Sequence, residues 1–157
     1  MPNTVEFYTL EEPSDVARLK LACRLVERAY LAGTRVLAWT GSPQELEGFD
    51  NLLWTFGDRA FVPHEMLPAD PASSEAPVLL TAAAELPPAA LTAGFGLLLN
   101  LRSSAVPPGG EFGTIVEVID GDDARRKAGR ERFRVYRERG IIPVHHKSDG
   151  ELGSANG

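Results

Sequence analysis

Two spacings of apolar residues alternate along the chain. Short continuous apolar runs at residues 77–82 and 95–101 are typical of strands buried on both faces of a parallel sheet. Residues 5–10 alternate and are rich in β-branched and aromatic residues, and residues 34–40 and 114–119 also predict strands. Segments with an apolar residue every three or four positions predict helices, and these lie at 14–32, 43–56 and 123–139. This order predicts one α/β domain with a doubly wound, mostly parallel sheet and helices on both faces.

The segments between these elements carry the residues of turns and loops. Residues 57–75 and 103–110 are rich in proline, glycine and serine, so we expect irregular loops there. Residues 85–92 predict a short helical turn. Beyond residue 143 the sequence becomes polar and glycine-rich, which predicts a domain over 1–143 and a disordered tail over 144–157.

The composition indicates a globular protein of the cytoplasm. A chain of 157 residues with 43% hydrophobic residues can bury a core. It has no apolar run near 18 residues and no basic segment followed by an apolar one, so we expect neither a membrane span nor a signal peptide. The single cysteine, Cys23, lies on the apolar stripe of the first helix, and we expect it to be buried and structural.

The sequence argues against enzyme chemistry. The turn at residues 10–14 has two carboxylates and no glycine, whereas a dinucleotide site needs glycines where the backbone approaches the pyrophosphate. No G-x-x-x-x-G-K-[ST] segment occurs. His64, His145 and His146 have no nucleophile near them in sequence, and no metal-ligand spacing stands out. We therefore expect no catalytic residues, no cofactor and no metal.

The charge of the chain is unevenly distributed. Residues 125–139 contain eight of the 16 basic residues and two acidic ones, so this stretch carries +6 in a chain of −6. On a helix, four of its arginines fall within about 80° of arc, with Phe133 beside them. They are Arg126, Arg130, Arg134 and Arg137. Such a stripe suits an acidic protein segment or nucleic acid. The remaining interpretation, a solvated face, is weakened because like charges four residues apart repel.

Gly129 interrupts this helix and costs about 1 kcal/mol relative to alanine. We expect it to allow close approach of another backbone.

Two aromatic residues lie off the second helix's apolar stripe. Trp54 is about 100° around the helix from Leu53, and Phe61 follows in the next loop. One interpretation is that the loop folds back and buries both rings. The other is an exposed aromatic patch that docks a protein, since aromatic residues anchor interfaces.

Several blocks of sequence together resemble a known family. They are Phe-Tyr-Thr-Leu at 7–10, Phe-Val-Pro-His at 61–64 and Arg-Glu-Arg-Phe at 130–133. Over roughly residues 1–143 the chain resembles the chi subunit of bacterial DNA polymerase III holoenzyme. The resemblance implies a single Rossmann-like domain without nucleotide or catalytic activity. It further implies an adaptor that links the clamp loader, through the psi subunit, to single-stranded DNA-binding protein.

The same resemblance implies two binding sites. The single-stranded DNA-binding protein ends in an acidic tail that finishes in Ile-Pro-Phe with a free carboxylate. Arg126 and Arg130 would pair with its carboxylates, and Phe133 and Ile119 would line a pocket for its apolar end. The family commonly has lysine and tyrosine where this chain has Arg126 and Phe133, so charge and ring are retained and a hydroxyl is lost. Trp54 and Phe61 would hold psi, or a helicase that uses the same surface.

Two alternatives stay open at this point. The basic helix could bind nucleic acid directly, although the remaining chain carries −12 and offers few rings for stacking beyond Phe133 and Tyr136. Under the adaptor hypothesis, by contrast, the protein contacts nucleic acid only indirectly, through its partner proteins. A nucleotide-dependent enzyme is the other alternative, and the glycine-free turn disfavours it.

Overall fold

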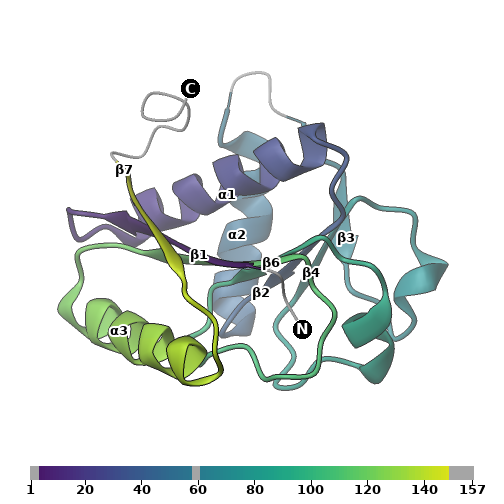
Figure 1. Cartoon of the computed structure of the whole chain (residues 1–157). Coiled ribbons are helices and arrows are strands. Elements are labelled where there is room, and N and C mark those ends of the chain that lie inside the picture. The colour runs from purple at the N-terminus through teal and green to yellow at the C-terminus, as the bar shows by residue number, and fades with distance from the viewer. Residues whose placement is uncertain (1–3, 58–60, 149–157) are drawn as a thin grey trace.

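The computed structural model describes residues 4–57 and 61–148 as three α-helices and seven strands (Figure 1). In chain order these are β1 (Thr4–Leu10), α1 (Asp15–Leu31), β2 (Val36–Trp39), α2 (Pro43–Thr55), β3 (His64–Met66), β4 (Val78–Thr81), β5 (Leu97–Asn100), β6 (Thr114–Ile119), α3 (Asp123–Glu138) and β7 (Val144–Ser148). Two short 3-10 helices, η1 (Pro71–Ser73) and η2 (Pro88–Thr92), lie in the connections. The second of them is the short helical turn predicted from the sequence.

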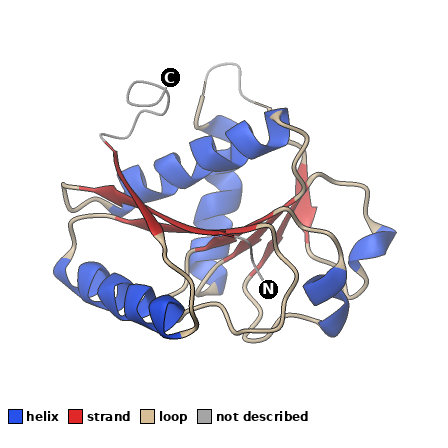
Figure 2. Cartoon of the chain, in the orientation of Figure 1, coloured by secondary structure: helices blue, strands red, loops and turns tan. Residues whose placement is uncertain are grey.

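All seven strands form one sheet in the order β3-β4-β2-β5-β6-β1-β7. Every neighbouring pair is parallel. The helices α1 and α2 cover one face and α3 covers the other (Figure 2). The prediction of a doubly wound α/β domain with helices on both faces is therefore confirmed, and the described sheet is parallel throughout.

Local chemistry sets the helix ends. Ser42 accepts a hydrogen bond from the backbone N–H of Glu45, whose side chain in turn accepts one from the backbone N–H of Gly41. Asp122 caps α3 by accepting a hydrogen bond from the backbone N–H of Arg125. Gly140 follows α3 with a φ of +87°, a conformation that a residue without a Cβ adopts at little cost.

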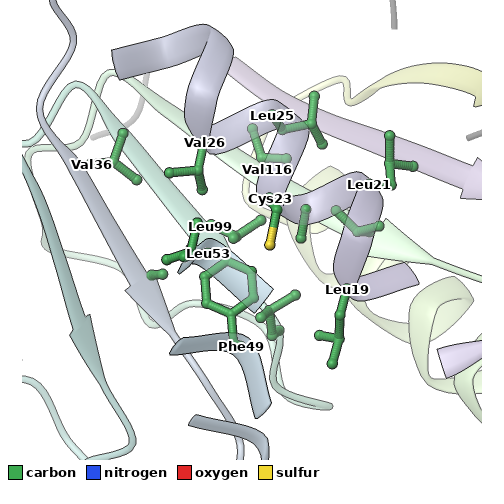
Figure 3. Packing of buried hydrophobic residues seen from close by; sticks show 14 of the residues in the cluster. Leu19, Leu21, Cys23, Leu25, Val26, Val36, Phe49, Leu53, Leu99 and Val116 are labelled. Carbon is green, nitrogen blue, oxygen red and sulfur yellow. The ribbon is translucent and has the colours of Figure 1, made fainter. Parts of the chain in front are cut away.

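The core on the α1–α2 side of the sheet is mostly apolar, and the buried Arg18 of α1 pairs with Glu45 of α2 at its edge. Figure 3 shows Cys23 of α1 pointing toward Phe49 and Leu53 of α2, and Leu99 of β5 and Val116 of β6 belong to the same buried cluster. Burial raises the pKa of the Cys23 thiol to about 12, so it stays protonated at neutral pH. The prediction that Cys23 is a buried structural residue is confirmed.

Two strands were not predicted, and both lie at edges of the sheet. β3 has three residues within the expected loop 57–75 and pairs only with β4. β7 lies within the expected disordered tail and pairs only with β1, so that expectation is wrong for residues 144–148. Edge strands bury less side-chain surface, so their sequences need no apolar run. Residues 149–157 of the expected tail lie outside the described residues.

Among the described residues, no helix combines the length and apolar character required to cross a membrane.

Leu53 offers a test of the α2 packing. Leu53→Ala removes a fully buried side chain and leaves a cavity, so we expect the free energy of unfolding to fall by about 2–5 kcal/mol. Glu47→Ala, on the exposed side of the same helix, should change it by less than about 0.5 kcal/mol. Urea denaturation followed by circular dichroism measures both. Equal stability of the two variants would contradict the described orientation of α2.

Candidate peptide-binding groove

The strands β1 and β6 are neighbours, but the helices that follow them leave to opposite faces of the sheet. In doubly wound folds a nucleotide commonly binds at such a point, with phosphate at a helix N-terminus. Here the two loops contact each other. The backbone N–H of Gly121 donates to the carbonyl of Glu12 at 3.0 Å, and a Cβ on Gly121 would lie 2.1 Å from the carbonyl oxygen of Glu11.

A carboxylate of the protein itself occupies the N-terminus of α1. Asp120, at the end of β6, is fully buried and accepts a hydrogen bond from the backbone N–H of Ser14 at 2.7 Å. Arg125 of α3 donates to both oxygens of Asp120, each at 2.7 Å. The backbone N–H of Ser14 and the guanidinium of Arg125, which could otherwise bind a phosphate, are therefore already bonded to Asp120. This arrangement disfavours a nucleotide at the N-terminus of α1.

A buried polar cluster fastens α3 to the sheet. Glu117 of β6 is fully buried and accepts hydrogen bonds from Arg132 at 2.9 Å, Tyr136 at 2.7 Å and Asn100 at 2.9 Å. Burial raises the pKa of Glu117, and Arg132 with the two neutral donors opposes that rise. Because Arg132 and Tyr136 point inward, the opposite side of α3 faces outward.

Gly129 lets α3 approach the sheet closely. A Cβ on Gly129 would lie 2.2 Å from Cδ1 of Ile119 on β6. The expectation of a close backbone was therefore wrong, because the neighbour is a side chain. The consequence is that Ile119 packs against α3, in the same apolar cluster as Phe133.

Half of the basic stretch is engaged within the protein. Arg125 pairs with Asp120, Arg132 with Glu117, and Arg134 with both Glu131 and Glu138. Arg139 donates to the carbonyl of Val106 and lies over the ring of Tyr136. Within residues 4–57 and 61–148, five basic residues of this stretch have no ion pair: Arg126, Lys127, Arg130, Arg137 and Arg139.

A groove of about 660 Å³ lies between α3, the ends of β1 and β6, and β7. Four residues singled out from the sequence line it together: Ile119, Arg126, Arg130 and Phe133. The rings of Phe133 and Phe7 lie 5.2 Å apart and, with Ile119, form an apolar floor. Arg126 and Arg130 are exposed, and Arg126 also donates to the carbonyl of Glu11 at 3.2 Å.

Arg134 and Arg137 lie beside this groove rather than in it. They line a second hollow of about 510 Å³, which shares Arg130 and Phe133 with the first. The charge of Arg134 is offset by its two glutamate partners, so Arg137 is the stronger candidate for an external contact.

The sequence did not indicate half of the groove. Besides Asp120 and Gly129, its remaining lining residues come from β1, the turn after it, and β7: Phe7, Thr9, Leu10, Glu11, His145, Lys147 and Ser148. Phe7 carried only the alternating pattern of a strand, and the residues of β7 carried no signal because that segment was expected to be disordered.

The second candidate surface is an aromatic patch formed by Trp54 and Phe61. Their exposed fractions are 50% and 62%, and their ring centroids lie 5.8 Å apart. His64 supports Trp54 from below at 4.4 Å, with its Nδ1 donating to the carbonyl of Val62 and its Nε2 lying 2.8 Å from Asp50. The interpretation in which the loop buries both rings is therefore wrong. This patch adjoins β3, at the opposite edge of the sheet from β7.

The fold and the two surfaces define a class of protein. It is a doubly wound α/β protein with a groove beside α3 and an exposed aromatic patch, and a carboxylate of the protein itself lies at the N-terminus of α1. The family model described as DNA polymerase III chi subunit, HolC, matches residues 1–143. The chain therefore belongs to the DNA polymerase III chi subunit family.

Curated relatives agree with this assignment. The chain is 35% identical over 151 residues to the DNA polymerase III subunit chi of Pseudomonas aeruginosa, covering 91% of this chain and 95% of that one. The subunit chi of Escherichia coli is 26% identical over 139 residues, covering 86% and 91%. That of Haemophilus influenzae is 26% identical over 148 residues, covering 89% and 94%.

The Asp120 cluster predicts a specific pH dependence of stability. Hydrogen bonds from Arg125 hold the pKa of Asp120 below its ordinary value of about 3.9. The ionised group therefore contributes stability above about pH 4, and this contribution is lost as the pH falls through the lowered pKa. Asp120→Asn should be less stable than wild type at pH 7, and the difference should shrink below pH 4.

Urea denaturation between pH 7 and pH 2.5 measures this difference. Glu47→Gln, an exposed carboxylate on α2, should follow the wild-type curve throughout. A constant difference between wild type and Asp120→Asn down to pH 2.5 would show that Asp120 has no lowered pKa.

Proposed function

We propose that this protein is a non-catalytic adaptor of the DNA polymerase III clamp-loader assembly. It links that assembly, in the cytoplasm, to the acidic C-terminal tail of single-stranded DNA-binding protein. The observation that carries the proposal is the groove in which unpaired Arg126 and Arg130 border an apolar floor. Membership of the chi family supports the more general part of this proposal, namely a role within DNA polymerase III.

The chemistry of the groove suits a peptide that is acidic along its length and apolar at its end. The floor of Phe7, Ile119 and Phe133 takes the terminal phenylalanine, since aromatic side chains gain most from such burial. Arg126 and Arg130 take the terminal carboxylate and a nearby acidic side chain, because guanidinium groups bind carboxylates bidentately. A volume of about 660 Å³ is in the usual range for small-ligand and peptide sites.

We assign the aromatic patch to the psi subunit, or to a helicase that uses the same surface. The rings of Trp54 and Phe61 are exposed. The ring of Trp54 packs on His64, which is buried and bonded through both of its nitrogens, and this contact holds Trp54 in place. Exposed aromatic residues of this kind anchor protein interfaces. The patch and the groove lie at opposite edges of the sheet, so one adaptor can hold two partners at once.

Direct binding of nucleic acid is the weaker alternative. Phosphate contacts need free cations spread along a surface. Arg125, Arg132, Arg134 and Arg139 are engaged within the protein, so the basic stretch offers about half of the charge that its sequence indicated.

Removal of Arg130 tests the groove. Arg130→Ala should weaken binding of a peptide of the single-stranded DNA-binding protein tail at least about tenfold, or about 1.4 kcal/mol, by isothermal titration calorimetry. Lys127→Ala removes the same charge from an exposed position of α3 that does not line the groove, and its affinity should stay within about twofold of wild type. Equal affinities for the two variants would refute the groove as the site. Steeply salt-dependent binding of an oligonucleotide without any partner would favour the alternative.

Removal of an aromatic ring tests the second surface. Phe61→Ala should abolish co-purification with the psi subunit and leave the affinity for the tail peptide unchanged, because the two surfaces are separate. Trp54→Ala should do the same, provided that thermal unfolding shows a folded protein. Leu31→Ala, at a residue 74% exposed at the end of α1, is the matched control and should retain psi. Retention of psi by folded Phe61→Ala and Trp54→Ala would exclude the patch.

A further inference from the structure

The strand β7 forms the wall of the groove that faces α3. It pairs in parallel with β1, with His145 opposite Phe7 and Lys147 opposite Thr9. Residues opposite each other in paired strands point to the same face of a sheet. Because the ring of Phe7 packs against Phe133 of α3, this register directs His145 and Lys147 toward α3 as well.

The other face of β7 is attached to the α1 side. His146 stacks on Tyr8 with ring centroids 4.5 Å apart, and its Nε2 lies 2.8 Å from Glu6. On the groove face, Nε2 of His145 lies 2.7 Å from the hydroxyl of Thr9. These contacts hold the strand in place on both faces, so the position of Lys147 along the groove is set by the sheet.

Lys147 adds a cation across the groove from the arginines. It is exposed, lines the groove, and has no ion pair among residues 4–57 and 61–148. The acidic groups that line the same groove are Glu11, which is exposed, and Asp120, whose oxygens are bonded to Arg125 and Ser14. The apolar floor therefore has positive charge on two sides, from α3 and from β7.

We propose that β7 is the second wall of the peptide site and that Lys147 binds acidic residues upstream of the apolar end. The proposal rests on the proposed function and deepens it, because it says how the rest of the peptide lies. When the apolar end of the peptide occupies the floor, its terminal carboxylate lies at the arginines of α3. The rest of the peptide then extends away from α3. Its preceding carboxylates then face the open side, where β7 supplies the available cation. The family model ends at residue 143, so this contact is assigned from β7 of this chain alone.

Two peptides separate this contact from the α3 contacts. One is an acidic peptide of about nine residues that ends in Ile-Pro-Phe, and the other is the Ile-Pro-Phe tripeptide with a free carboxylate. Lys147→Glu should weaken the long peptide about three- to tenfold at low salt, since an exposed attraction becomes a repulsion. It should change the tripeptide affinity less than twofold, whereas Arg130→Ala should weaken both peptides.

Three further variants serve as controls. Lys20→Glu makes the same charge change on the exposed side of α1, across the sheet, and should bind both peptides as wild type does. Lys147→Arg should retain wild-type affinity, and Lys147→Ala should show a smaller loss in the same direction. Thermal unfolding of each variant checks that β7 is retained.

The outcomes are distinguishable. If wild type binds the long peptide and Arg130→Ala weakens it, but Lys147→Glu matches Lys20→Glu, the assignment of β7 is wrong and the proposed function stands. An equal loss for both peptides in Lys147→Glu also overturns the proposal, because it indicates a general disturbance of the groove. If wild type binds neither peptide, the proposed function fails and this inference fails with it.

Discussion

The fully buried carboxylate of Glu117 sets how α3 lies on the sheet. It accepts hydrogen bonds from Arg132, Tyr136 and Asn100, so three donors from two other elements converge on one side chain. A buried charge that loses its partner costs about 3–5 kcal/mol, so α3 cannot rotate about its axis without a large penalty. This constraint points Arg132 and Tyr136 inward and, by the geometry of the helix, leaves Arg126 and Arg130 to border the groove.

The same helix therefore divides its basic residues between two tasks. Arg125 and Arg132 pair with carboxylates at the end and middle of β6, where they hold the helix to the sheet. Arg126 and Arg130 have no such partners and face solvent over an apolar floor. Gly129 packs closely against Ile119, and this contact brings α3 near enough to the sheet for the apolar floor to form. The paired arginines and the arginines that border the groove therefore lie on one closely packed helix.

The position that binds nucleotides in many doubly wound proteins is closed here by the protein's own groups. Asp120 takes the place of an anion at the start of α1, and Arg125 neutralises it. The neighbouring groove, between α3 and the edge strand β7, is open to solvent instead. In the proposed adaptor this arrangement leaves one edge of the sheet for an acidic peptide and the other, beside β3, for a partner that recognises aromatic side chains.

The sequence by itself determined the class of fold, five of the seven described strands and all three helices. Apolar spacing and capping are local properties, and they specify central strands and amphipathic helices directly. It also indicated the four residues Ile119, Arg126, Arg130 and Phe133 that the groove brings together. Only the tertiary structure decided which arginines remain unpaired, because the carboxylates that engage Arg125 and Arg132 come from β6. It alone revealed β3 and β7, since edge strands depend on pairing with distant backbone and need no apolar pattern of their own.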